Sequence, residues 1–408
     1  MDVLSRPVID RTLPLLTEGY AWLPNRMRDS SGPVVRTRIL GRPALALRGP
    51  EAVRFFYDER NVHRHRAIPE PVLGTLFGRE AVHNLDGAAH RARKAVFLPL
   101  LAPERVAGLV EEVTAAWDEA VPAWSRRCAV VLFDEAAVVL TRGGHRWAGV
   151  PLADGDAPAT ARDMIAMVDG FASAGPRHLR ARGRQEDRLT RLVREVRAGT
   201  VTAPEGSVLA RVCGHRDADG ELLDEKTAAV ELLNVVRPAA AVAWFVAFLA
   251  HALHRHPEHR VPLGDGDAAF ATVFTHEVRR FYPFVPFLGG LAARDLMWRG
   301  EWVPAGGLVL LDVYGQNHDE LLWGDPYAFR PRRFLGRPAG RDELIPQGGG
   351  DPATGHRCPG EGLTVGVLEA LAARLARMEY TVPEQNLTIP LHRVPTRPRS
   401  GLLMADVR

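Results

Sequence analysis

One cysteine, Cys358, stands in a glycine-rich segment near the C-terminal end of the chain. The segment reads GGG at 348–350 and GHRCPG at 355–360. Glycines let a backbone approach a flat cofactor without Cβ clashes, and Pro359 suits the first turn of a helix. The free N–H groups of such a turn favour a charged sulfur, so the segment predicts a thiolate that donates to a haem iron. Taken alone, the segment is equally compatible with a buried, inert cysteine.

A second group that could take part in chemistry is the arginine in LLNVVRPAAA, residues 232–241. Arg237 is flanked by valine and alanine, and a guanidinium in such surroundings requires an anion. Pro238 follows it and would remove a backbone hydrogen bond and kink a helix. The residues alone favour a carboxylate of the protein itself as the anion.

An acid and a base three residues apart, Glu277 and Arg280, form a third group. Side chains at this spacing lie on one face of a helix and can pair. By itself the pair is a weak signal. It is followed, however, by FRPRRF at 329–334 and then by the cysteine segment.

Helices must position these groups, because helical periodicity dominates from Pro103 onward. Apolar residues recur at spacings of three and four in 104–124 and 187–199. The longest candidate helix extends from about Lys226 to His256, and another runs from Pro359 to about Met378. Short β-like runs occur at 34–40, 43–48, 380–389 and 400–407. We therefore predict a mainly α protein with small β-sheets, forming one domain over residues 1–408.

The composition argues against several classes of protein. The formal net charge of the 408 residues is only +3, and the arginine-rich run from Arg177 to Arg197 also contains acids. That run predicts a solvated helical face, so we expect no nucleic-acid partner. Three widely spaced cysteines, Cys128, Cys213 and Cys358, argue against a disulfide framework and for a reducing compartment.

No signal peptide is recognisable at the N-terminus, where no long apolar core follows a basic cap. The longest apolar run, 238–250, is shorter than the about 20 residues that span a bilayer. We therefore expect a cytoplasmic protein without an integral membrane segment.

The ordered motifs E-x-x-R (277–280), F-R-P-x-R-F (329–334) and G-H-R-C-P-G (355–360) resemble the haem-thiolate cytochrome P-450 superfamily. The resemblance implies the cytochrome P-450 fold, a large helical domain around a buried haem b. It also implies that Cys358 is the axial ligand of the haem iron. Behind the haem, Glu277, Arg280 and either Arg332 or Arg333 would form a structural lock.

Two departures from the usual pattern resemble one branch, the bacterial fatty-acid peroxygenases. Most members carry an acid and an alcohol that deliver protons, where this chain has Arg237-Pro238 and then three alanines. Asp351 stands seven positions before the cysteine, where a phenylalanine is usual. The similarity to that branch extends from end to end and is nearly word for word in these segments: DGAAHRARK (86–94), LLNVVRP (232–238), RRFYPFVPFLGGL (279–291), LLDVYGQNHD (310–319), IPQGGG (345–350) and GHRCPGEG (355–362).

The branch implies a role for Arg237, with Pro238 beside it. A guanidinium above the haem would hold a fatty-acid carboxylate by a bidentate contact, and that carboxylate would act as the acid and base that split hydrogen peroxide. The substrate thereby completes the site, and a reductase partner is not expected to be required. Because the carboxylate is anchored near the iron, oxidation should occur at the carboxyl end of the substrate.

His83 matches the position above the haem where hydroxylating members often carry Gln and decarboxylating members carry His. This match favours formation of a terminal alkene, and an imidazole there could donate a proton or hydrogen-bond near neutral pH. Without the resemblance, His83 is more simply a loop histidine satisfied by backbone groups.

The resemblance also implies contacts to the haem propionates and to the substrate tail. His90, Lys94 and His356 would contact the propionates. A zinc site built on His356 and Cys358 is disfavoured, because the other cysteines have no neighbouring ligands. Val285 stands where relatives tend to have Gly, which predicts a bulkier wall near the haem. Apolar pocket positions, each also compatible with ordinary core, are Phe77, Val168, Phe171, Phe284 and Phe287.

The leading hypothesis is hydrogen-peroxide-dependent oxidation of long-chain fatty acids, giving terminal alkenes by decarboxylation together with 2- and 3-hydroxy acids. Three alternatives stay open. The protein could be a hydroxylase that forms little alkene, a monooxygenase that depends on a reductase, or a non-catalytic haem-thiolate sensor that binds fatty acid.

Overall fold

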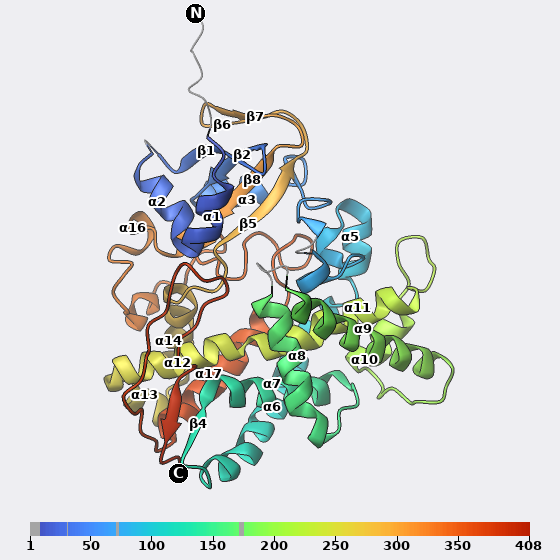
Figure 1. Cartoon of the computed structure of the whole chain (residues 1–408), viewed down its shortest axis with the longest axis vertical. Helices are drawn as coiled ribbons and strands as arrows, with labels where there is room; N and C mark the ends of the chain where they lie inside the picture. The colour runs from blue at the N-terminus through green and yellow to red at the C-terminus, as the bar shows by residue number, and fades with distance from the viewer. Residues whose placement is uncertain (1–8, 31, 71–72, 171–174) are drawn as a thin grey trace, which may run out of the picture.

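The computed structural model describes residues 9–30, 32–70, 73–170 and 175–408. The five-stranded sheet and the β6–β7 pair lie at one end of the molecule, β4 lies near the opposite end, and helices make up most of the rest, as Figure 1 shows. The prediction of a mainly α protein with small sheets is confirmed.

The helices are α1 (Thr12–Glu18), α2 (Trp22–Arg28), α3 (Pro50–Tyr57), α5 (Gly87–Lys94), α6 (Pro103–Trp124), α7 (Leu132–Ala148), α8 (Ala157–Asp169), α9 (Pro176–Arg197), α10 (Val208–Gly214), α11 (Glu225–Ala241), α12 (Ala243–Arg255), α13 (Arg260–Gly264), α14 (Ala268–Phe281), α15 (Val313–Asn317), α16 (Glu320–Trp323) and α17 (Glu361–Arg377). Single turns that matter for the site are η2 (Leu73–Phe77), η3 (Val82–Asn84) and η7 (Pro331–Phe334). The strands are β1 (Val34–Ile39), β2 (Arg42–Leu47), β3 (Val62–His63), β4 (Ala129–Val131), β5 (Phe287–Ala292), β6 (Leu296–Trp298), β7 (Glu301–Val303), β8 (Leu308–Asp312) and β9 (Leu403–Ala405).

The largest sheet has the strand order β1-β2-β8-β5-β3. β1 and β2 form an antiparallel hairpin at the two runs predicted near the N-terminus, and β8 lies parallel to β2. Two smaller antiparallel pairs are β4 with β9 and β6 with β7. The predicted run at 400–407 contributes β9. At 380–389, in contrast, the residue that pairs is Thr381, in an isolated bridge to Ala405, and Pro383, two residues later, has no N–H to donate to a ladder.

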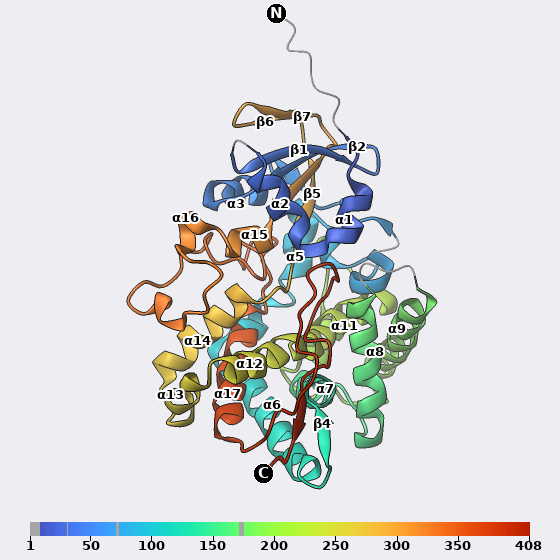
Figure 2. The same ribbon diagram turned by 60° about the vertical axis from the view of Figure 1, so that its left-hand side comes forward.

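Two consecutive helices, α11 and α12, cross the helical half of the molecule, as Figure 2 shows. They correspond to the predicted helix from Lys226 to His256, which the structure interrupts at Val242. Pro238, four residues earlier, has no N–H to donate to the Asn234 carbonyl, so one bond of the α11 ladder is missing. The stretch 225–255 is long and apolar enough to cross a membrane, but 83% of its most apolar window is buried within the protein, as in a core helix.

The arginine-rich helix α9 only partly forms the solvated face that the sequence predicts. Arg184, Arg191 and Arg194 are exposed on it, as expected of a solvated face. Arg182, however, is buried. It is accommodated because its Nε donates to Glu186 Oε1 at 2.6 Å and its Nη1 donates to the Leu76 carbonyl at 2.7 Å.

Candidate active site

Cys358 lies on the loop between the η7 turn and α17, three residues before that helix begins. Its N–H donates to the Gln347 carbonyl at 3.3 Å. Pro359 and Gly360 form a turn, and Glu361 is the first helical residue. The predicted helix start at Pro359 was therefore two residues early. Gly360 takes the cap position because the chain turns sharply away from the cysteine.

The three glycines at 348–350 serve packing against α3. A Cβ on Gly348 would stand 2.5 Å from the Tyr57 hydroxyl, and one on Gly349 would stand 2.3 Å from a Val53 methyl carbon. Gly348 also has a φ of +94°, which side-chain-bearing residues rarely adopt. The glycines thus bring the cysteine loop against α3, a reason that the sequence did not disclose.

Behind the sulfur lies a polar network that the sequence analysis did not identify. The Gln347 side-chain nitrogen lies 4.0 Å from Cys358 Sγ and donates to Thr364 Oγ1 at 3.1 Å. Arg279 donates to Gln347 Oε1 at 3.1 Å and pairs with Glu361. Burial raises the pKa of the Cys358 thiol, with the Lys94 and Arg279 charges acting in the opposite direction. The turn N–H groups alone therefore do not secure a thiolate, whereas coordination to a metal deprotonates a thiol outright.

The predicted ion pair between Glu277 and Arg280 is present and buried on α14. Arg280 Nε and Nη2 donate to the two carboxylate oxygens of Glu277 at 2.8 Å and 2.9 Å. Arg333 completes the group, with its Nε 3.1 Å from Glu277 Oε2. Arg332 is not part of it, because its guanidinium lies over the Phe270 ring instead. The sequence left open whether Arg332 or Arg333 pairs with Glu277. In the structure Arg333, on the η7 turn, is the arginine that does so.

Arg237 is buried on α11, and its Nε has no hydrogen-bond partner within the described ranges. No ion pair joins it to a carboxylate of the described part of the chain, so the interpretation that the protein supplies its anion is wrong. Burial, and next the Arg182 guanidinium, lower the pKa of Arg237 to about 9. The side chain therefore remains a cation at neutral pH. Pro238, the next residue, is exposed, whereas Arg237 is buried and Ala239 is half-buried.

His83 belongs to η3, and its ring packs against Phe77 in a tilted pair with 4.4 Å between ring centroids and 34° between the ring planes. Its Nδ1 is buried and has no hydrogen-bond partner among the residues that the structure describes. The interpretation as a loop histidine satisfied by backbone groups therefore does not hold for Nδ1. Burial, followed by the Arg237 charge, lowers the pKa of His83 to about 3. The imidazole is neutral near pH 7 and can donate a hydrogen bond, but it carries no second proton there.

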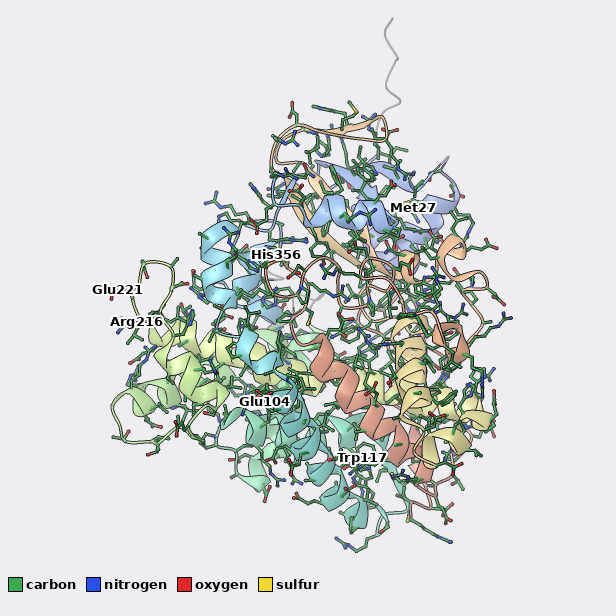
Figure 3. The ribbon with its side chains drawn as sticks, turned by 180° about the vertical axis from the view of Figure 1, so that it is seen from behind. Met27, Glu104, Trp117, Arg216, Glu221 and His356 are labelled. Atoms are coloured by element: carbon green, nitrogen blue, oxygen red, sulfur yellow. The ribbon has the colours of Figure 1, made fainter. Side chains whose placement is uncertain are left out.

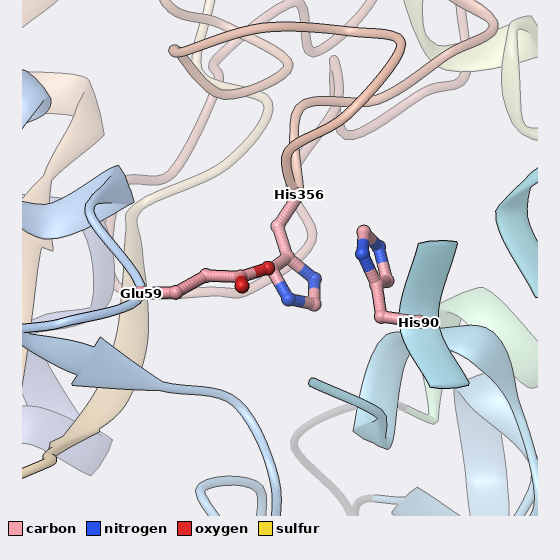
Figure 4. Close-up of side chains that lie close together, drawn as sticks. All are labelled: Glu59, His90 and His356. Atoms are coloured by element: carbon pink, nitrogen blue, oxygen red, sulfur yellow. The ribbon is translucent and has the colours of Figure 1, made fainter. Parts of the chain in front are cut away.

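The three residues expected at the propionates lie together at the edge of the cysteine loop. The His90 and His356 rings are stacked with 3.9 Å between centroids. Lys94, one turn after His90 on α5, donates to the carbonyls of Gly355 and Arg357, the latter at 3.1 Å. Figure 3 labels His356 in this region, and Figure 4 shows its imidazole between Glu59 and His90.

The ligating groups of Glu59, His90 and His356 lie within 4.8 Å of one another, as do those of His256, Glu258 and His259. Neither group contains Cys358, so the described residues do not support a zinc site built on Cys358 and His356.

The pocket positions are dispersed over several elements. Val168 packs on the main helical core, and Val285 packs on the core beside the large sheet. Phe284 lies 4.3 Å from Phe245 between ring centroids, and Phe287 lies 6.1 Å from Trp22. Phe171 lies outside the described residues. Of this set, Phe77 is the residue that contacts another predicted site residue, His83.

The arrangement fits a haem on several counts. Cys358 Sγ lies at a glycine-lined loop, and buried polar atoms without described partners occur at His83 Nδ1, His90 Nδ1 and Arg237 Nε. The Cys358 thiol and the Arg237 guanidinium are close enough for the charge of one to affect the pKa of the other. Cys358 would hold the iron, and His90, Lys94 and His356 would hold the carboxylates at the cofactor edge.

The comparisons with known proteins agree with this geometry. The cytochrome P-450 family model matches residues 269–393. Cytochrome P-450 137 of Mycobacterium tuberculosis is 27% identical over 242 residues, which cover 56% of this chain and 49% of that protein. The chain thus spans about half the length of that curated relative. Abscisic acid 8'-hydroxylase 3 of Oryza sativa is 26% identical over 402 residues, covering 88% of this chain and 76% of the relative.

Solved structures match over nearly the whole chain. Cytochrome P450SP alpha in complex with (R)-ibuprophen has a TM-score of 0.95 and 39% identity, covering 98% of this chain and 99% of that one. A variant of cytochrome P-450 OleT in complex with arachidonic acid has a TM-score of 0.95 and 36% identity, covering 99% of both chains. With this identity and coverage, the chain belongs to the cytochrome P-450 family, in the branch that contains P450SP alpha and OleT.

Proposed function

We propose that this protein is a haem-thiolate peroxygenase that oxidises long-chain fatty acids near the carboxylate with hydrogen peroxide. Its products would be terminal alkenes together with 2- and 3-hydroxy acids. The observation that carries the proposal is Arg237, a buried cation on α11 that has no carboxylate partner in the described part of the chain. A ligand that brings its own carboxylate would satisfy it.

The ligands of the two solved relatives support this choice of substrate class. Arachidonic acid, bound to the OleT variant, and (R)-ibuprophen, bound to P450SP alpha, are both carboxylic acids. Arg237 is well suited to such a group, because a guanidinium donates two parallel hydrogen bonds to a carboxylate. A pKa of about 9 keeps it charged at the pH where a fatty acid is ionised.

In the proposed mechanism the substrate carboxylate transfers a proton between the two oxygens of hydrogen peroxide. When bound, the haem iron with its thiolate ligand supplies the two-electron oxidation by hydrogen peroxide. Arg237 orients the carboxylate so that it accepts a proton from one peroxide oxygen and returns it to the other, which leaves as water. Ala239, Ala240 and Ala241 offer no acid for this transfer, so the substrate itself has to supply the group.

Two product classes follow from the same oxidation. Hydroxylation inserts one oxygen atom into a C–H bond and releases one water. Decarboxylation removes one hydrogen atom and one electron from the substrate carboxylate and releases carbon dioxide, and with one proton taken up these reduce hydrogen peroxide to two waters. Because Arg237 holds the carboxylate, the two carbons next to it would lie nearest the oxidant. His83, neutral and packed against Phe77, would stand beside the carboxylate and favour the alkene.

The test is product analysis by gas chromatography and mass spectrometry. The purified haem protein is incubated with a long-chain saturated fatty acid and hydrogen peroxide, without reductase or nicotinamide cofactor. We expect a terminal alkene one carbon shorter than the acid, accompanied by hydroxy acids. Hydroxy acids alone would establish a hydroxylase. No product with intact haem would refute the proposal in favour of a reductase-dependent or non-catalytic protein.

Replacing His83 by Gln is expected to move product from alkene toward hydroxy acid. Glutamine keeps a hydrogen-bonding side chain but loses the imidazole ring that packs against Phe77. The position of the substrate carboxylate relative to the oxidant would therefore change. The ratio of alkene to hydroxy acid should fall several-fold, while the haem content is unchanged. His254→Gln, which changes an exposed histidine in the last turn of α12, is the control. An unchanged ratio in the His83 variant would remove this residue from the mechanism.

A further inference from the structure

We infer that Glu231 and Asn234 are positioning residues that fix where His83 and Phe77 stand relative to Arg237, and thereby set the product ratio. The inference rests on the proposed function. Both residues are buried on α11, and neither was identified from the sequence.

Glu231 holds the turn that carries His83. One of its carboxylate oxygens, Oε1, accepts the Val82 N–H at 2.7 Å, and Val82 is the first residue of η3. The same oxygen accepts Arg93 Nη1 at 3.1 Å. The side chain of Glu231 is 0% exposed, so these bonds form away from water, where their loss is costly. A buried carboxylate therefore pins the residue that directly precedes His83.

Asn234 holds the neighbouring site residue. Its Nδ2 donates to the Phe77 carbonyl at 3.0 Å and lies 3.3 Å from Glu231 Oε2. The Phe77 ring in turn packs against the His83 ring. The two buried side chains thus support the two sides of one aromatic pair, since Glu231 holds the backbone next to His83 and Asn234 holds the backbone of Phe77.

The spacing along α11 places Glu231 and Asn234 on the same helix as Arg237, which would bind the substrate carboxylate. Glu231, Asn234 and Arg237 are three residues apart, so successive members are neighbours on the helix surface, with about 4.5 Å of rise between them. Any shift of the turn carrying His83 relative to α11 therefore changes its distance from a carboxylate held by Arg237. Misplacement by about 1 Å at a reacting group can cost about 10²-fold in rate.

The groups around the Glu231 carboxylate explain why a glutamate stands there. The Val82 N–H, the Arg93 guanidinium and the Asn234 amide are all donors. A glutamine would turn its own NH₂ group toward one of them, so Glu231→Gln breaks a contact at almost unchanged volume. Arg93 keeps Asp217 and the Glu80 carbonyl as further partners, which limits the damage to the fold.

The test compares Asn234→Ala and Glu231→Gln with the wild-type haem protein. The matched control is Glu225→Gln, at the start of the same helix, where the carboxylate pairs with Arg194 on the exposed surface. The measurements are the ratio of alkene to hydroxy acid, kcat and KM for the fatty acid, and hydrogen–deuterium exchange of peptides covering residues 76–85.

In both variants we expect the ratio to fall at least threefold and kcat to fall more than KM rises, because Arg237 is untouched. Exchange in 76–85 should be at least tenfold faster, and the control should match the wild type. An unchanged ratio overturns the inference, whether or not exchange is faster, and so does an equal change in Glu225→Gln. Should Asn234→Ala not retain haem, Glu231→Gln decides. Absence of product from the wild-type protein would instead refute the proposed function.

Discussion

Replacing Arg237 by Ala is expected to lower peroxide-driven kcat/KM for a long-chain fatty acid by about 10²- to 10³-fold or more. The variant loses the charge that binds the carboxylate and, with it, the group that would move the proton. α11 has alanines at the next three positions after Pro238, so none of these three side chains can replace it. The rate of product formation at saturating peroxide is the measurement.

Two further variants sharpen this prediction. Arg237→Lys keeps a positive charge but loses the planar pair of donors, so its activity should lie between those of wild type and Arg237→Ala. Arg191→Ala, on the exposed face of α9, removes an arginine without touching the site and should be fully active. Haem content and the optical spectrum should be the same in all four proteins. Normal turnover in Arg237→Ala would refute the carboxylate anchor.

The largest loss of stability is expected on replacing Glu277 by Ala. Glu277 accepts from Arg280 and Arg333 and also from the Arg330 N–H at 2.7 Å. Glu277 and Arg280 are both 0% exposed, so the substitution leaves a buried guanidinium without its anion. Breaking a buried pair in this way costs roughly 3–5 kcal/mol of unfolding free energy. That is a large part of the 5–15 kcal/mol typical of folded proteins.

Urea unfolding of the haem protein, followed by circular dichroism, measures this effect. Glu277→Gln retains an acceptor for one arginine and should lose less stability than Glu277→Ala. Glu225→Gln removes a surface charge of the same kind and should stay within about 0.5 kcal/mol of wild type. If the midpoint for Glu277→Ala coincided with that of the control, Glu277, Arg280 and Arg333 would not act as a structural lock.

Local sequence information was sufficient for several features of this protein. The periodicity of 104–124 and 187–199 depends on neighbours within one or two turns, and the helices α6 and α9 formed there. The ion pair of Glu277 and Arg280 was predictable for the same reason, since its partners are three residues apart on one helix. Arg237 was recognisable because a charge in an apolar stretch requires a partner wherever the chain folds.

The tertiary structure alone decided which groups meet across the chain. It chose Arg333 over Arg332, packed the glycines of the cysteine loop on α3, and left Arg237 without a protein carboxylate among the described residues. Glu231 bonds to a residue 149 positions away, and Asn234 to one 157 positions away. Contacts of this range leave no local periodicity, because they depend on how whole helices pack rather than on the spacing of residues within one. The sequence alone therefore determined which residue types can do the chemistry, and the packing decided which of them stand together.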